Sequence, residues 1–120
     1  MDNNLNQCPV KYALNILNGK WKFAIVWELG QCEFLRFNEL QRKLDGISNL
    51  MLSKSLQELE ESKIIHRHQY NEIPPRVEYS LTSLGKSLSV VIQSLEEWGI
   101  EAMKMNGKID SNGLKEDNFK

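Results

Sequence analysis

The sequence lacks the features of secreted proteins and of enzymes. Its 120 residues include only two cysteines, too few for a disulfide framework. No apolar run reaches the length of a membrane span, and the first seven residues lack the basic start and apolar stretch of a secretion signal. We therefore expect a cytoplasmic protein without a membrane segment. A glycine-rich phosphate loop is missing too, as is any nucleophile–histidine–acid motif. We expect neither an enzyme nor a cofactor.

The middle third of the chain has the pattern of a helix-turn-helix. Phe37, Leu40 and Leu44 lie three and four residues apart, which places them on one face of a short helix. Gly46 can take the left-handed conformation that ends a helix, and Ser48 can cap the next helix by accepting a backbone hydrogen bond. Two helices joined by only three residues must cross at a steep angle. The second helix is expected to run to about residue 62 and to bury four apolar side chains, those of Met51, Leu52, Leu56 and Leu59.

Charge divides this second helix along its length. Its first half has no acidic residue, whereas its second half begins with Glu58. Asparagine and glutamine can pair with adenine, lysine with guanine or phosphate, and serine with either, while carboxylates would be repelled by phosphate. An ordinary solvated helix fits the composition alone, but the adjoining turn and ribbon favour DNA reading. The side chains expected on the exposed face of the first half, with the capping Ser48, are Asn49, Leu50, Ser53, Lys54 and Gln57.

A two-stranded ribbon follows. Residues 64–70 are rich in β-forming types, and residues 77–81 alternate apolar and polar. Proline cannot donate to a strand ladder, so the segment 71–75 is expected to form the hairpin tip. Arg67 on the first strand and Arg76 beside the tip are expected to reach phosphates or a minor groove, with the Arg76 side chain presented outward. A hairpin that merely covers one end of the core remains the alternative for either residue.

The same residues match a known family in order. The matching segments are Cys8-Pro9-Val10, Gly19-Lys20-Trp21-Lys22, Arg36-Phe37-Asn38-Glu39-Leu40, Gly46-Ile47-Ser48 and residues 74–82. Over roughly residues 8 to 100 the chain resembles the HxlR-type family of bacterial winged-helix transcription regulators. The resemblance implies a homodimer on double-stranded DNA, with residues 48–57 as the recognition helix and the residues around Arg76 as the wing. Many members carry a basic or polar residue where this chain has Leu50, so Leu50 is expected either to touch a thymine methyl or to lie against the protein.

The charges also bear on DNA binding. Lysine and arginine number 15 and aspartate and glutamate 16, so the formal net charge is −1, and affinity for DNA is largely electrostatic. The distribution is bipolar, however, because carboxylates gather towards the C-terminus. We therefore expect DNA binding with modest non-specific affinity. The cations in or beside the predicted reading head are Arg36, Arg42, Lys43, Lys54, Lys63, Arg67 and Arg76.

The flanking helices indicate a dimer. One is expected to start at Pro9 and to end at Gly19, and another to be capped by Thr82 and to reach about Met105. Both are apolar around more of their girth than one small domain can bury, which predicts a homodimer. The expected fold is mainly α with a small β-hairpin wing (α+β), a winged helix-turn-helix with extra N- and C-terminal dimerisation helices. It occupies residues 8–105, between a flexible N-terminus (1–7) and a polar, disordered tail (106–120).

Cys8 carries the sharpest chemical alternative. It precedes Pro9 at a predicted helix N-terminus, where backbone N–H groups and Lys11 would favour the reactive thiolate. Some family members sense oxidants or electrophiles through a cysteine at this place, so a redox switch stands beside plain packing for Cys8. A third reading is a winged-helix protein-interaction module without DNA binding. His66 and His68 share a strand face, but no third ligand lies near them in sequence, so we expect no metal site.

Overall fold

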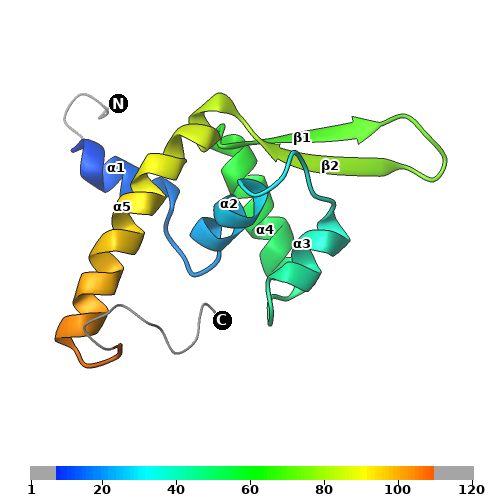
Figure 1. The fold of residues 1–120 in the computed structure, drawn as a ribbon. Coiled ribbons are helices and arrows are strands. Elements are labelled where there is room, and N and C mark those ends of the chain that lie inside the picture. Colours follow the sequence, from blue (N-terminus) through cyan, green and yellow to red (C-terminus); the bar gives the residue numbers. More distant parts are fainter. Residues whose placement is uncertain (1–7, 110–120) are drawn as a thin grey trace.

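The computed structural model describes residues 8–109, which form five helices and a two-stranded antiparallel sheet (Figure 1). The expected mainly α fold with a β-hairpin wing is confirmed. The expectations for residues 1–7 and 110–120 lie outside the described residues. In chain order the elements are α1 (Pro9–Ile16), α2 (Lys22–Leu29), α3 (Phe37–Lys43), α4 (Asn49–Glu61), β1 (Ile65–Tyr70), β2 (Arg76–Leu81) and α5 (Ser83–Met105).

The helix-turn-helix consists of α3, α4 and the turn between them. The backbone N–H of Arg36 donates to the Glu39 carboxylate at 2.8 Å, which secures the start of α3. Gly46 has a φ of +89°, so it takes the left-handed conformation expected of it. The Ser48 hydroxyl then accepts from the backbone N–H of Met51 at 3.1 Å and caps α4, as predicted.

The hairpin is held to the body of the domain at its base. Ile65 pairs with Leu81 at the base and Tyr70 with Arg76 at the tip. Leu35, just before α3, forms a single bridge with Tyr79, through two backbone hydrogen bonds of 2.8 and 2.9 Å. This bridge fixes the start of the helix-turn-helix against β2. The base of the wing is therefore tied directly to the start of α3.

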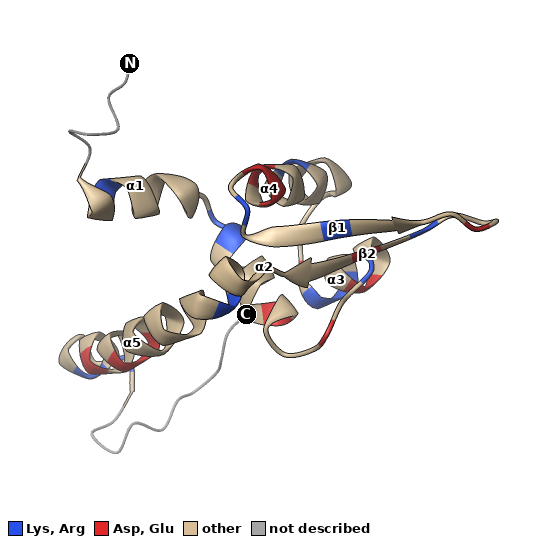
Figure 2. Cartoon of the chain, turned by 90° about the horizontal axis from the view of Figure 1, so that it is seen from above, with Lys and Arg blue, Asp and Glu red and all other residues tan. Residues whose placement is uncertain are grey.

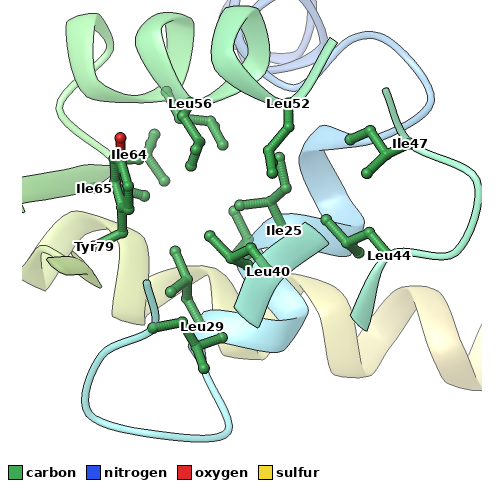
Figure 3. Packing of buried hydrophobic residues seen from close by; sticks show 13 residues of the cluster. Ile25, Leu29, Leu40, Leu44, Ile47, Leu52, Leu56, Ile64, Ile65 and Tyr79 are labelled. Carbon is green, nitrogen blue, oxygen red and sulfur yellow. The ribbon is translucent and has the colours of Figure 1, made fainter. Parts of the chain in front are cut away.

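The core lies where α2, α3, α4 and the base of the hairpin meet (Figure 3). Leu52 and Leu56 of α4 point into it in Figure 3, and Leu59 is buried with them, as the three- and four-residue spacing predicted. Met51, expected to be buried with them, is instead 41% exposed. Met51 precedes Leu52 by one residue, about 100° around the helix, and so lies at the edge of the buried stripe.

The two outer helices differ in how they join the core. Thr82 caps α5 through the N–H of Gly85, and a Cβ on Gly85 would lie 2.2 Å from the Ile64 carbonyl oxygen. The first turn of α5 thus packs directly on backbone. Helix α1 ends at Ile16, three residues before Gly19, which had been expected to end it. Beyond α5 the chain makes a hydrogen-bonded turn and buries Ile109.

Candidate nucleic-acid interface

The first half of α4 presents an exposed, carboxylate-free face. Its members are Ser48, Asn49, Ser53, Lys54 and Gln57, all exposed, as the sequence predicted. The Leu50 side chain is 80% exposed, so the expectation that it might lie against the protein is wrong. Glu58 and the two glutamates after Leu59 occupy the other end of the helix. Side chains on this face can therefore approach a phosphate-lined groove at the helix N-terminus without bringing an anion with them.

A contact from α3 holds the tip of this face. Gln41 Nε2 donates a hydrogen bond to Asn49 Oδ1, so an amide of α3 supports an amide of α4. This contact leaves Nδ2 of Asn49 available as a hydrogen-bond donor. Gln41 was not among the predicted site residues. Its polar character was visible, but its partner depends on how the two helices cross, which spacing alone does not give.

An ion pair between a buried lysine and a partly exposed glutamate joins α2 to α4. Lys22, the first residue of α2, is only 7% exposed, and its Nζ lies 2.8 Å from Glu58 Oε1 of α4. The hydrogen bond and positive charge of Lys22 lower the pKa of the Glu58 carboxyl. Lys22 stands in the Gly19-Lys20-Trp21-Lys22 segment, but no role was predicted for it. A signal was present, since Lys22 shares one helical face with Ile25, Val26 and Leu29, all buried.

The wing does not present Arg76 outward as expected. Its guanidinium lies 3.1 Å from the Glu72 carboxylate and 3.8 Å from that of Glu78, and it stacks on the Tyr70 ring at 3.9 Å. Glu78 is buried, and it also accepts a hydrogen bond from the Tyr70 hydroxyl at 3.0 Å, which raises the pKa of Tyr70. The outward orientation was wrong because Glu72 in the hairpin tip and Glu78, two residues along the same strand, both pair with the guanidinium, while Tyr70 lies opposite Arg76 in the strand register.

Two other predicted cations remain accessible. Arg36 and Arg67 are exposed, and Arg67 Nη1 makes only a 3.3 Å hydrogen bond to Gln69. The register places Arg67 and Arg76 on opposite faces of the hairpin, because side chains alternate along a strand. Figure 2 shows a basic position on β1 and repeated acidic positions along α5. Positive charge available to a nucleic acid is thus drawn from α4, β1 and the start of α3.

The two cysteines occupy different settings. Cys8 is exposed and is the N-cap residue of α1, directly before Pro9. The Cys32 thiol donates to the Glu28 carbonyl at 3.6 Å, and partial burial, aided by Glu28 and Glu39 against Lys43, raises its pKa. Only Cys8 has the position expected of a sensing thiol.

Within residues 8–109, no group of three histidine, cysteine or acidic side chains could hold a metal ion. In the same range, no helix combines the length and the apolar composition that a membrane span requires.

Comparisons with known proteins agree with this geometry. The model of the HxlR-like helix-turn-helix family matches residues 16–106. The chain is 38% identical over 117 residues to the uncharacterized HTH-type transcriptional regulator YybR of Bacillus subtilis, covering 98% of this chain and 93% of that protein. It superposes on the reduced form of the redox regulator HypR with a TM-score of 0.74 and 38% sequence identity, over 81% of this chain and 94% of that chain. It superposes on the reduced form of the transcriptional regulator YodB of B. subtilis with a TM-score of 0.73 and 31% sequence identity, over 87% of this chain and 99% of that chain.

The arginine contacts generate a prediction about the wing. Arg67→Ala should make the dependence of log binding constant on log salt concentration shallower by about one unit, because one phosphate contact is lost. Arg76→Ala should leave that slope unchanged and lower hairpin stability instead, since its charge is already matched by Glu72 and Glu78. Fluorescence anisotropy with labelled duplex across a salt series measures both. A shallower slope for Arg76→Ala would show that Arg76 leaves its carboxylates to bind DNA.

Proposed function

This chain belongs to the HxlR-like helix-turn-helix family, and we propose that it binds a pseudo-palindromic DNA operator as a homodimer. It is a helix-turn-helix transcriptional regulator and not an enzyme. The sequence-based recognition of the family is thereby confirmed. Its DNA target would place the regulator in the cytoplasm. The observation that carries the proposal is the exposed, carboxylate-free first half of α4, presented directly after the turn of the helix-turn-helix.

Base reading is assigned to the N-terminal turns of α4. Asn49 and Gln57 offer amides that suit adenine, while Lys54 offers a cation to guanine or phosphate. Asn49 arrives already oriented by Gln41, so less side-chain freedom is lost when it binds a base. Ser48 caps the helix with its hydroxyl, and Ser53 sits one turn after Asn49. Arg36 at the start of α3 and Arg67 on β1 are exposed cations that would contact phosphates.

A homodimer is supported by apolar surface that the described residues leave uncovered. Helix α1 buries none of its side chains, and α5 buries only Gly85 over 23 residues. Isolated exposed apolar residues are common, but contiguous apolar helix faces mark interaction sites. Two-fold pairing through these helices would set two copies of α4 about 34–36 Å apart, one turn of DNA. The large exposed apolar side chains of the two helices are Val10, Tyr12, Leu14, Leu84, Val90, Val91, Leu95, Trp98 and Met105.

The reading face predicts two kinds of loss. Lys54→Glu should weaken binding to every duplex, because a phosphate-compatible cation becomes a repelled anion. Asn49→Ala or Gln57→Ala should cost about 1–3 kcal/mol and relax preference at particular base pairs. Selection from a random duplex library, followed by anisotropy titration, measures both effects. Lys86→Glu, the same charge change on exposed α5, is the matched control. Tight binding that survives all three α4 changes would contradict the assignment.

Leu50 generates a separate prediction. Since its side chain points away from the protein, we expect it to contact the 5-methyl group of a thymine. Replacing that thymine by uracil removes only the methyl group. Burying one methyl-sized group contributes roughly 0.8 kcal/mol, so the replacement should weaken binding by about fourfold. Leu50→Ala should be indifferent to the same replacement. If wild type responds to uracil at no position of the selected site, Leu50 does not read a methyl.

Self-association can be tested with one charge. Trp98 is 70% exposed on α5, so Trp98→Glu should place a carboxylate in the dimer contact and yield monomer in sedimentation equilibrium at micromolar concentration. Ile73→Glu makes an equivalent change at the exposed hairpin tip and should leave the dimer intact. A wild-type chain that sediments as a well-behaved monomer would refute the dimer.

Redox sensing through Cys8 is a second candidate, favoured by the exposure of this thiol at the N-cap of α1 and by the likeness to the redox regulator HypR. The expected result is that mild oxidation changes DNA affinity in wild type and in Cys32→Ser but not in Cys8→Ser. DNA affinity of the wild type that is indifferent to the oxidant would leave Cys8 without a sensory role.

A further inference from the structure

Lys22 joins three helices through one ammonium group. Besides the 2.8 Å contact to Glu58 Oε1 in α4, its Nζ donates to the Ile16 carbonyl oxygen at 3.3 Å. Ile16 is the last residue of α1, where carbonyls lack partners within the helix and carry partial negative charge. The α2 lysine therefore binds the end of α1 and the C-terminal half of the recognition helix at the same time.

Little else among the described residues holds α1 to the domain. None of its residues is buried; Ile16 is partly buried against the core, and Leu17 follows it into the interior. Helices α1 and α4 line opposite sides of a groove of about 510 Å³, with Tyr12 and Asn15 on one side and Lys54 and Glu61 on the other. Lys22 also lines this groove. Open space beside the contact means that side-chain packing does not fix the angle between the two helices.

We propose that Lys22 is a positioning residue that fixes recognition helix α4 relative to α1 and thereby sets the half-site spacing that the dimer accepts. This inference rests on the proposed function, a homodimer that pairs through α1 and α5. In such a dimer α1 is placed by its contact with the partner, and α4 is placed by the DNA. By two-fold symmetry, a movement of α4 relative to α1 occurs in both protomers. The distance between the two recognition helices therefore changes by the sum of the two displacements.

A buried ammonium group stabilises the contact between helices only when both of its partners are in position. Removing a charge from water is costly, and the cost is offset only while the carboxylate and the carbonyl both stay in place. The link therefore favours one arrangement of α1, α2 and α4. Lys20, two residues earlier, offers a contrast, because it is exposed and only stacks near the Trp21 ring at 4.9 Å. It carries the same charge in the same segment without bridging any helices.

The experiment compares spacing with sequence preference. A site is first selected with the wild-type chain from a random duplex library. Affinities are then measured for duplexes with both half-sites intact and the spacer changed by one or two base pairs, and for single-base changes within a half-site. Wild type should lose roughly tenfold or more per base pair of altered spacing, within the range of a mismatched position. The Lys22→Met variant should lose no more than about threefold in affinity per base pair of altered spacing. Single-base changes within a half-site should weaken its binding as much as they weaken that of wild type.

Controls separate positioning from folding. Lys20→Met should keep the wild-type spacing preference, and Lys22→Arg should restore much of it. If Lys22→Met does not fold by circular dichroism, Glu58→Gln removes the charge of the partner and should flatten the preference in the same direction. A uniform loss of affinity at all spacings, or an unchanged preference in the folded variants, would overturn the inference. Wild type that selects no site, or shows no spacing preference, would overturn the proposed dimer on DNA and the inference with it.

Discussion

The burial of one face of α4 is the constraint on which the rest of the structure depends. Leu52, Leu56 and Leu59 pack among side chains from α2, α3 and the base of the hairpin, and each fully buried leucine stabilises the fold by about 1.5–3 kcal/mol. Because the same helix carries the predicted reading residues, its rotation about its axis is fixed by the core. A turn of the helix that exposed Leu52 would also remove Asn49 from the surface where Gln41 holds it. Recognition and stability thus share one element.

How much of this was visible in the sequence depends on the range of the interaction. Caps, turns and buried stripes are local, so Ser48, Gly46, Thr82 and the leucines of α4 were predicted correctly. The outward orientation of Arg76 was wrong, and the alternative, a pairing with Glu78 or Glu72, is what the structure has, since both carboxylates lie within four residues of Arg76. Its contact with the Tyr70 ring depends on the strand register, which a sequence does not specify to one residue.

Lys22 and Gln41 show the same limit in a milder form. The position of Lys22 on the buried face of α2 could be read from spacing, but its carboxylate partner lies 36 residues away on another helix. The contact of Gln41 depends on the crossing of α3 and α4. In both cases the residue type was informative, whereas the partner required the tertiary arrangement.

Pairing within the protein also explains how a chain of net charge −1 can serve a polyanion. Among residues 8–109, three cations are matched by ion pairs: Arg76 by Glu72 and Glu78, Lys22 by Glu58, and Lys104 by Glu101. Those carboxylates therefore act inside the domain, and the exposed Lys54 and Arg67 keep their charge for phosphate. A net charge near zero gives weak long-range attraction, so non-specific affinity should be modest. Discrimination between DNA sequences must then come from close contacts of α4. The ion pair of Lys22 with Glu58 and the hydrogen bond of Gln41 to Asn49 hold this helix in place.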